Sequence, residues 1–281
     1  MDKWCDLHTH SIFSDGTCSP AEIIDGAIKA GLSAIALTDH NTVDGLPDFM
    51  TAAKDKPIEA IPGAEISVDY NGIELHMLGL FIKPEYFPQI SELMQVVMHR
   101  KEQSNINLIE SLARLGIHLD YDEIKRTTPN GQINRAHIAT AMTQKGYTHS
   151  IEEAFETHLS KSAGFYKEPQ RITVWEALDF IQSIGAVSVL AHPFLNLSKK
   201  ELADFLPLAK EKGLVGIECY YSLYDEETTA ASLRIANDFG FLRSGGSDFH
   251  GSRKPGIRLG VGKGNLKIPY EWHLDLKHVA Y

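Results

Sequence analysis

The sequence predicts an α/β fold in which strands and helices alternate along the chain, interrupted near its middle by a helical segment. Three observations predict it. Short apolar runs, many of them β-branched, recur between helical patterns, which is the order that produces parallel strands. Strand signals are scarce between about residues 95 and 165. Side chains of metal-ligand type follow several of the apolar runs, as they do at the carboxyl ends of barrel strands.

Composition limits the classes of function. With 281 residues, 43% of them hydrophobic, the chain is long enough to bury a barrel-sized core, with or without an insertion. The net charge of −10 and the lack of a dense Lys/Arg run argue against duplex DNA as a partner, whereas small phosphate esters remain compatible if metal ions supply positive charge. No apolar stretch of about 18 residues and no signal segment after Met1 are visible, and the three cysteines are widely spaced. We therefore expect a cytoplasmic protein that does not bind membranes.

The first strand–helix–strand unit is the clearest part of the pattern. An apolar run at 4–8 predicts a strand. Ser19, Pro20 and Glu22 have the spacing of a capping box with proline in the first turn, which predicts a helix that ends near Gly31. The next elements expected are a strand at 34–37, a helix at about 43–54, a strand that approaches residue 65, and a strand pair over 65–82 that turns at Asn71-Gly72.

The middle of the chain differs in character from its C-terminal part. A helical pattern runs from about 92 to 115, and we interpret 95–165 as a helical insertion between two parts of one barrel, 1–94 and 166–281. The alternation then resumes with a helix at 174–184, a strand at 187–191, a helix at 199–212, a strand at 215–220, a helix at 226–239 and a strand that leads to residue 248. This repeated order indicates a parallel α/β barrel or sheet.

Residues of metal-ligand type stand where these strands end. His8 and His10 are two residues apart in an extended run, so their side chains point to the same face, and Asp15 follows on the next turn. The strand pair would also return His76 towards Glu65. The nine candidate ligands are His8, His10, Asp15, His40, Glu65, His76, His192, Asp248 and His250. Nitrogen and oxygen donors gathered in this way are typical of a hydrolytic divalent-metal site.

Six separated motifs resemble those of the PHP (polymerase and histidinol phosphatase) family of metal-dependent phosphoesterases. In order they are His8-Thr9-His10 with Ser14-Asp15-Gly16, Thr38-Asp39-His40-Asn41, Gly63-Ala64-Glu65, His76, Ala191-His192-Pro193 and Gly246-Ser247-Asp248-Phe249-His250. The resemblance implies a distorted (β/α)7 barrel with up to three divalent ions, Mn, Fe or Zn, and hydrolysis by a hydroxide that bridges them. It implies one ion on His8, His10, Glu65 and Asp248, a second on Glu65, His76 and His192, and a third on Asp15, His40 and His250.

The predicted insertion carries a shorter resemblance. Its segment Ile133-Asn134-Arg135-Ala136-His137-Ile138-Ala139, with Gly146-Tyr147 and Lys161-Ser162, resembles a PHP subgroup that removes the 3′-phosphate of nucleoside 3′,5′-bisphosphates or degrades short RNA from its 5′ end. Relatives often carry Pro where this chain has Ala136. The resemblance implies that Arg135, His137 and Lys161 bind substrate phosphate, with His137 a candidate acid for the leaving group; without it, Arg135 and Lys161 would be read as solvated charges. The expected substrate is a small nucleotide phosphate or short single-stranded RNA, and the insertion is its lid.

Other interpretations stay open at this point. The chain would suit a phosphomonoesterase of another small substrate such as histidinol phosphate, or a non-catalytic PHP regulatory module, although the latter predicts lost ligands. A metal-dependent amidohydrolase is a third, against which the Asp248-Phe249-His250 arrangement speaks. Asp39 is expected either to orient a ligand histidine or to cap a turn. For Phe165 and Tyr166 we expect packing rather than stacking on a base.

Overall fold

The computed structural model describes residues 3–128 and 133–280 of the chain. These residues form two compact units. The first comprises Met1–Met94 with Ile172–Tyr281, and the second comprises Gln95–Arg171. Among the described residues, no helix combines the length and the apolar character that crossing a membrane would need.

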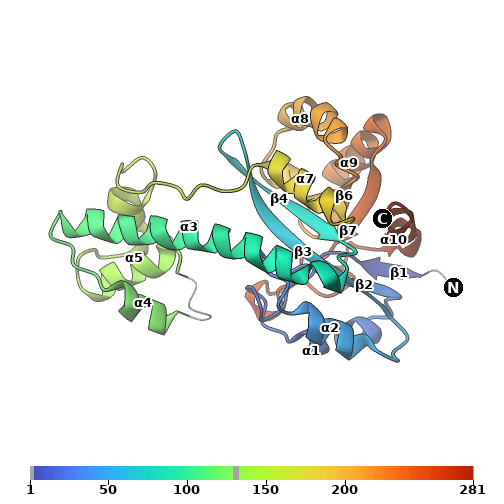
Figure 1. Ribbon diagram of the computed structural model, residues 1–281, viewed down its shortest axis with the longest axis horizontal. Helices are drawn as coiled ribbons and strands as arrows, with labels where there is room; N and C mark the ends of the chain where they lie inside the picture. Colours follow the sequence, from blue (N-terminus) through green and yellow to red (C-terminus); the bar gives the residue numbers. More distant parts are fainter. Residues whose placement is uncertain (1–2, 129–132, 281) are drawn as a thin grey trace. The chain divides into compact units, whose positions relative to one another are not determined.

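The first unit is built around one eight-stranded sheet with the order β7-β6-β5-β4-β3-β2-β1-β8 (Figure 1). Backbone hydrogen bonds from Leu7 N to Gly245 O and from Asp248 N to His8 O join β1 to β7, so the sheet curls into a nearly closed barrel. The strands are β1 (Trp4–Asp6), β2 (Ala34–Leu37), β3 (Glu59–Tyr70), β4 (Ile73–Leu80), β5 (Val187–Ala191), β6 (Gly216–Tyr221), β7 (Leu242–Gly246) and β8 (Ile268–Pro269).

The barrel departs from regular parallel pairing at two places. β4 runs antiparallel to both β3 and β5, and the short β8 pairs antiparallel with β1. The reversal of β4 follows from the turn between β3 and β4, where Asn71 and Gly72 both have positive φ angles of 53° and 82°, as a two-residue hairpin requires. The predicted distorted (β/α)7 barrel is therefore confirmed, and β8 is an addition that the sequence did not predict.

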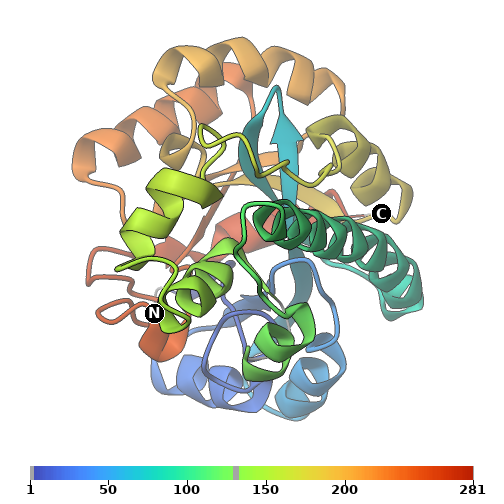
Figure 2. The same cartoon turned by 90° about the vertical axis from the view of Figure 1, so that its left-hand side faces the viewer.

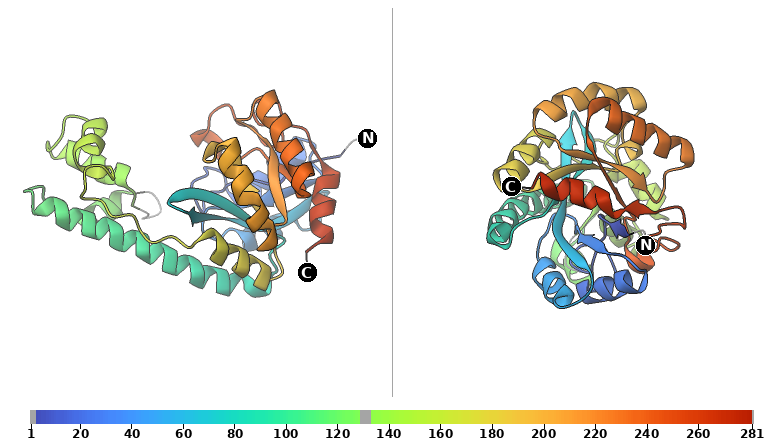
Figure 3. Two further views of the ribbon diagram at one scale, coloured as in Figure 1. Left: turned by 90° about the horizontal axis from the view of Figure 1, so that it is seen from above. Right: turned by 90° about the vertical axis from the view of Figure 1, so that its right-hand side faces the viewer.

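Helices surround the strands of this unit (Figure 3), with α1 and α2 packed side by side (Figure 2). Capping boxes begin three of the helices, with N-caps Ser19, Thr173 and Ser198. The bounds are α1 (Pro20–Lys29), α2 (Leu46–Ala53), α7 (Val174–Ser183), α8 (Lys199–Glu211), α9 (Glu226–Phe239) and α10 (Tyr270–His278), with short 3-10 turns η1 (Pro84–Tyr86), η4 (Pro193–Leu195) and η5 (Gly251–Arg253). These N-cap residues therefore fix the positions at which three of the surrounding helices begin.

The core of the first unit lies between the sheet and these helices. All four residues of β2 are buried, and Phe49 of α2 and Phe205 of α8 are fully enclosed. Full burial of such a side chain contributes about 1.5–3 kcal/mol. Where β7 approaches β1, Gly246 lies so close to the neighbouring chain that a Cβ atom there would come within 2.1 Å of His8 Cβ. Because glycine has no Cβ atom, β1 and β7 can lie close together just before the polar residues that follow each strand.

The second unit is helical and has its own core. It contains most of α3 (Phe87–Ala113) together with α4 (Tyr121–Thr127), α5 (Arg135–Gln144), α6 (Ile151–Ala154) and the π-helical turn η3 (Phe155–Leu159). Buried side chains of α3 and α5, such as Leu108, Leu112 and Met142, form its centre. Phe165 and Tyr166 pack against this core, as expected.

Two boundaries differ from those expected. α3 begins at Phe87 rather than near residue 92, because Pro88 occupies the first helical turn, where proline is tolerated. The second unit ends at Arg171 rather than at 165. The ring of Tyr166 lies 4.1 Å from the guanidinium carbon of Arg135, and Ser104 Oγ donates to the carbonyl of Lys167, so these residues stay with the insertion.

Candidate metal centre

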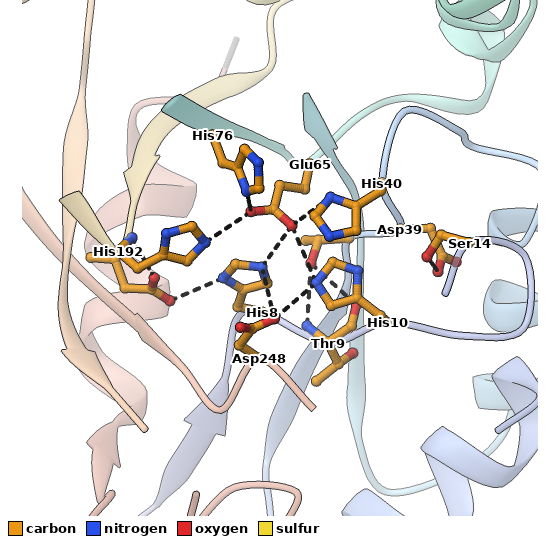
Figure 4. Close-up of polar contacts among 12 residues, drawn as sticks. His8, Thr9, His10, Ser14, Asp39, His40, Glu65, His76, His192 and Asp248 are labelled. Atoms are coloured by element: carbon orange, nitrogen blue, oxygen red, sulfur yellow. Dashed lines mark hydrogen bonds and ion pairs between the residues drawn. The ribbon is translucent and has the colours of Figure 1, made fainter. Parts of the chain in front are cut away.

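All nine candidate ligands come together at one end of the barrel, where the parallel strands β1, β2, β5 and β7 have their carboxyl ends (Figure 4 labels seven of them). His8 and His10 directly follow β1, His40 follows β2, and His192 follows β5. Glu65 lies within β3 and His76 within β4, brought together by the hairpin, and Asp248 and His250 follow β7. This is the arrangement expected from the sequence, including the return of His76 to Glu65.

Glu65 lies at the centre of the cluster and is completely buried. Its Oε1 is 2.8 Å from His76 Nδ1 and 3.1 Å from His192 Nε2. Its other oxygen, Oε2, faces three further imidazole nitrogens, His8 Nε2 at 3.1 Å, His10 Nε2 at 3.2 Å and His40 Nδ1 at 3.1 Å. One carboxylate therefore lies between two sets of histidines, in the position of a bridging ligand.

Asp248 presents its two oxygens in different directions. Oδ1 faces the cluster, 3.2 Å from His10 Nε2 and 3.4 Å from His250 Nδ1. Oδ2 accepts from Tyr221 Oη at 2.8 Å and from Lys254 Nζ at 2.5 Å. Burial and the Asp248 carboxylate raise the pKa of Tyr221, so the phenol keeps the proton that it donates. The two donors hold Asp248 with one oxygen free for the cluster.

Asp15 and two histidines form the more exposed edge of the site. Asp15 Oδ1 lies 3.2 Å from His250 Nε2 and 4.0 Å from His40 Nε2. The Asp15 side chain is 44% exposed, whereas that of His250 is buried. His10 completes a group of four whose donor atoms lie within 4.8 Å of one another.

The donor atoms fit divalent metal ions. Among the described residues, four buried polar atoms of this cluster have no hydrogen-bond partner: His8 Nε2, His10 Nδ1, His10 Nε2 and Glu65 Oε2. Leaving buried polar atoms without partners is costly, by about 1–3 kcal/mol each. Imidazole nitrogens and carboxylate oxygens in close groups are the donors that transition metals prefer. The residues present therefore suit metal ions that would satisfy these atoms.

The electrostatics keep the carboxylates ready to bind cations. Burial alone would raise the pKa of Glu65, but the imidazoles of His40, His8 and His76 hold it well below its usual range. Burial likewise opposes ionisation of Asp248, yet the neighbouring histidines lower its pKa. Both carboxylates are therefore charged in the folded protein. Without ions, desolvation lowers the pKa of His40 to about 3, so that ring is neutral and can donate a lone pair.

Asp39 organises the loop after His10, and its carboxylate makes no described hydrogen bond to any of the nine ligand side chains. Its carboxylate accepts from the Ser11 amide at 2.7 Å, from Ser11 Oγ at 2.6 Å and from Ser14 Oγ at 2.5 Å. Of the two roles expected for Asp39, the structure shows the turn-capping one. The loop that carries Asp15 is thereby held against the end of β2.

Three residues near the cluster were not predicted from the sequence. Glu218 and Tyr221 lie on β6, and Lys254 follows η5. An acidic residue inside the apolar run Gly216–Tyr221 was a usable signal for Glu218, because a charge buried in a strand needs partners. Lys254 carries no such signal, since its contact with Asp248 depends on the fold of the loop after β7.

The substrate-binding candidates Arg135, His137 and Lys161 lie in the second unit, where each has a partner. Arg135 Nη1 donates to the Leu159 carbonyl at 3.0 Å. His137 Nδ1 accepts from the Asn134 amide at 3.1 Å, which closes a capping box at the start of α5. Lys161 Nζ is 2.6 Å from Glu168 Oε2. Their roles towards a substrate remain a prediction.

Comparisons with known proteins agree on one family. The model of the PHP domain family matches residues 6–184. A 5′-3′ exoribonuclease of Haemophilus influenzae is 30% identical over 251 residues, which cover 89% of this chain and 91% of the relative. A 3′,5′-nucleoside bisphosphate phosphatase of Chromobacterium violaceum is 29% identical over 257 residues, covering 91% and 90%. A solved structure from Bifidobacterium adolescentis has the same fold, with a TM-score of 0.75 and 24% identity over 99% of this chain and 97% of the other.

Proposed function

The chain belongs to the PHP domain family, and we propose that it is a metal-dependent phosphoesterase that hydrolyses a phosphate ester of a small nucleotide. The substrate class is a nucleoside 3′,5′-bisphosphate, from which it removes the 3′-phosphate, or the 5′ end of short single-stranded RNA. The two relatives named above carry these two activities in their names, and each aligns over about nine-tenths of this chain. The observation that carries the proposal is the buried Glu65 carboxylate, which lies within 3.2 Å of five imidazole nitrogens.

Up to three divalent ions, Mn, Fe or Zn, fit the donor sets. The first would be held by His8, His10, Glu65 and Asp248, the second by Glu65, His76 and His192, and the third by Asp15, His40 and His250. The two-sided contacts of Glu65 support a bridging role for its carboxylate. Such ions, when bound, make water nucleophilic near neutral pH and neutralise charge on the phosphoryl oxygens.

The charges and hydrogen bonds of the residues around the ions favour cation binding. The Asp248 and Glu65 carboxylates are ionised in the absence of cations. A cation that binds to them therefore displaces no proton from either carboxylate. Tyr221 and Lys254 fix the outer oxygen of Asp248. Lys254, whose side chain is 40% exposed, also places a positive charge at the rim, where it attracts an anionic substrate.

The second unit supplies the groups that select the substrate in this proposal. Arg135 is held by the Leu159 carbonyl and by the ring of Tyr166, and its guanidinium has five N–H donors, so it retains donors for a phosphate. His137 accepts the Asn134 N–H at Nδ1, which in the neutral ring leaves the proton on Nε2. In this proposal, His137 donates that proton to the leaving oxygen. Lys161 adds a mobile positive charge.

The other interpretations are not favoured. A regulatory module that had lost its chemistry would show missing ligands, whereas all nine are present and close together. The names of the two relatives specify RNA and a nucleoside bisphosphate as substrates, which favours a nucleotide substrate over histidinol phosphate. The membership in the PHP domain family also speaks against an amidohydrolase of carbon–nitrogen bonds.

A substrate panel tests the proposal. The purified chain is first stripped with a chelator and then reloaded with Mn. Phosphate release is measured from an adenosine 3′,5′-bisphosphate, nucleotide release from a 5′-phosphorylated RNA of about five nucleotides, and phosphate release from histidinol phosphate. We expect metal-dependent turnover of at least one of the two nucleotide substrates. Hydrolysis of histidinol phosphate alone would contradict the proposed substrate class.

A further inference from the structure

Glu218 is a buried carboxylate beside the metal centre that the nine-ligand set does not include. It lies on β6 and is fully enclosed. Its Oε1 is 3.2 Å from His8 Nδ1, and its Oε2 accepts from the backbone N–H of His192 at 2.7 Å. Burying a charge without partners would be costly, so these two contacts account for its presence there.

A break in the strand pairing accompanies the position of Glu218. Between β6 and β7 the register shifts between Glu218 and Tyr220, so the ladder is irregular at that point. Irregularities of this kind occur near active sites, where they change the direction in which a side chain points. Glu218 consequently faces the ligands that follow β1 and β5, and Tyr221 faces Asp248.

The contact with His8 determines which of its ring nitrogens is available. A carboxylate accepts a hydrogen bond, so Nδ1 carries the proton in the His8–Glu218 pair. Nε2 then holds the lone pair, and this is the atom that lies 3.1 Å from Glu65 Oε2. Histidine ligands whose second nitrogen donates to a carboxylate are fixed in tautomer and ring orientation.

The contact with the His192 amide supports the backbone conformation of a second ligand. His192 has a φ of 27° and a ψ of 55°, a left-handed conformation that is unfavourable for a residue with a Cβ and is disfavoured further before Pro193. Its amide donates to Glu218 Oε2, which helps to hold this conformation. From there the ring places Nε2 3.1 Å from Glu65 Oε1.

We propose that Glu218 is a positioning residue that fixes His8 and His192, on the two sides of Glu65, for metal binding. The inference rests on the proposed function and assigns Glu218 no contact with the ion itself. The two oxygens of Glu218 already accept from the ring N–H of His8 and the amide N–H of His192. Glu218 contacts Nδ1 of His8, whereas Nε2 of the same ring faces Glu65. If Glu218 were a ligand instead, His8 would have to bind through Nδ1.

Glu218→Gln tests the inference. Glutamine has nearly the same shape but only one acceptor oxygen, so it cannot accept from both His8 and His192. We expect the affinity for Mn, measured by competition with a chelator, to fall about 10- to 100-fold, which is typical when the partner of a ligand histidine is removed. The control is Glu226→Gln in the exposed first turn of α9, for which no change in affinity is expected.

A second measurement uses the unaltered protein and therefore does not depend on the variant folding. In the Zn-loaded protein with 15N-labelled imidazoles, we expect His8 to show a protonated Nδ1 and a metal-bound Nε2. A metal-bound Nδ1, or an unchanged Mn affinity in the glutamine variant, would overturn the inference. Failure of the unaltered protein to bind any metal would instead contradict the proposed function. A crystal structure of Glu218→Gln in which the His8 ring and the His192 backbone keep their positions would then overturn the role of Glu218.

Discussion

At the scale of single residues, Glu65 places one carboxylate oxygen against two imidazoles and the other against three. Replacing it with glutamine removes the carboxylate that both sets share. We expect Glu65→Gln to lower metal affinity and phosphoesterase activity by more than the roughly 100-fold typical of a residue that only orients a ligand. Metal content after dialysis and phosphate release check this. A variant with normal metal content and normal turnover would contradict the bridging role.

Lys254 gives a subtler prediction, because it contacts a ligand but is not one. Its ammonium shares Asp248 Oδ2 with Tyr221, so Asp248 keeps one donor when the lysine is replaced. We expect Lys254→Met to retain the metal and to reduce kcat/KM for a nucleotide about 10-fold, mainly through KM, because a positive charge at the rim is lost. Lys263→Met, an exposed lysine in a later loop, is the matched control. An equal loss of kcat/KM in both variants would contradict this, because it would show that the net charge of the protein matters and the position of Lys254 does not.

Several of these residues were predictable from the sequence and others were not. The nine ligands stand beside strand signals that can be read locally, such as the alternation of His8 and His10. Glu218 carries a local signal, since it is an acidic residue inside an apolar strand, but its partner His8 lies 210 residues away and cannot be identified from spacing. Lys254 carries no such signal, because its contact with Asp248 depends on the fold of the loop after β7.

At the scale of secondary-structure elements, local chemistry determined most of the boundaries. The capping boxes at Ser19, Thr173 and Ser198 begin helices where capping requires them. The Asn71-Gly72 turn reverses the chain and brings β4 beside β3, which places His76 at Glu65. α3 begins at Phe87, before the start expected near residue 92, because Pro88 suits a first helical turn and does not interrupt the helix. β8 was missed because a two-residue strand has no periodicity to detect.

The contacts of Glu59 on β3 with α10 predict how the stability of the fold depends on pH. Burial opposes ionisation of Glu59, but hydrogen bonds and charges from Lys277, His273 and Tyr270 lower its pKa below the usual value. A lowered pKa stabilises the fold above the unfolded value of about 4.3, and that contribution is lost as the pH falls through the folded pKa. We expect Glu59→Gln to destabilise the protein by about 1 kcal/mol at pH 7.

Urea unfolding at several pH values measures this contribution. The difference between Glu59→Gln and the unaltered protein should shrink as the pH falls below about 4, where the glutamate also becomes neutral. Glu85→Gln, at an exposed position, serves as the control. A difference that stays constant over this range would show that the charge of Glu59 contributes nothing.

At the scale of the whole molecule, we propose that the two units have separate roles, and this separation can be tested. In our proposal the first unit holds the ions and the second supplies Arg135, His137 and Lys161. We expect Arg135→Ala to leave metal affinity unchanged while kcat/KM for a nucleoside 3′,5′-bisphosphate falls by about 100-fold, because a charge-assisted phosphate contact is lost. Arg126→Ala on α4 is the control, since its side chain bonds only a backbone carbonyl among the contacts described for it.

The most direct test of the metal centre is a crystal structure of the Mn-loaded protein with anomalous scattering. The account predicts anomalous peaks at coordination distance from the Glu65 carboxylate and from His8 Nε2, with Glu65 shared between two ions. Peaks confined to surface positions, or ions that leave Glu65 without contact, would contradict it.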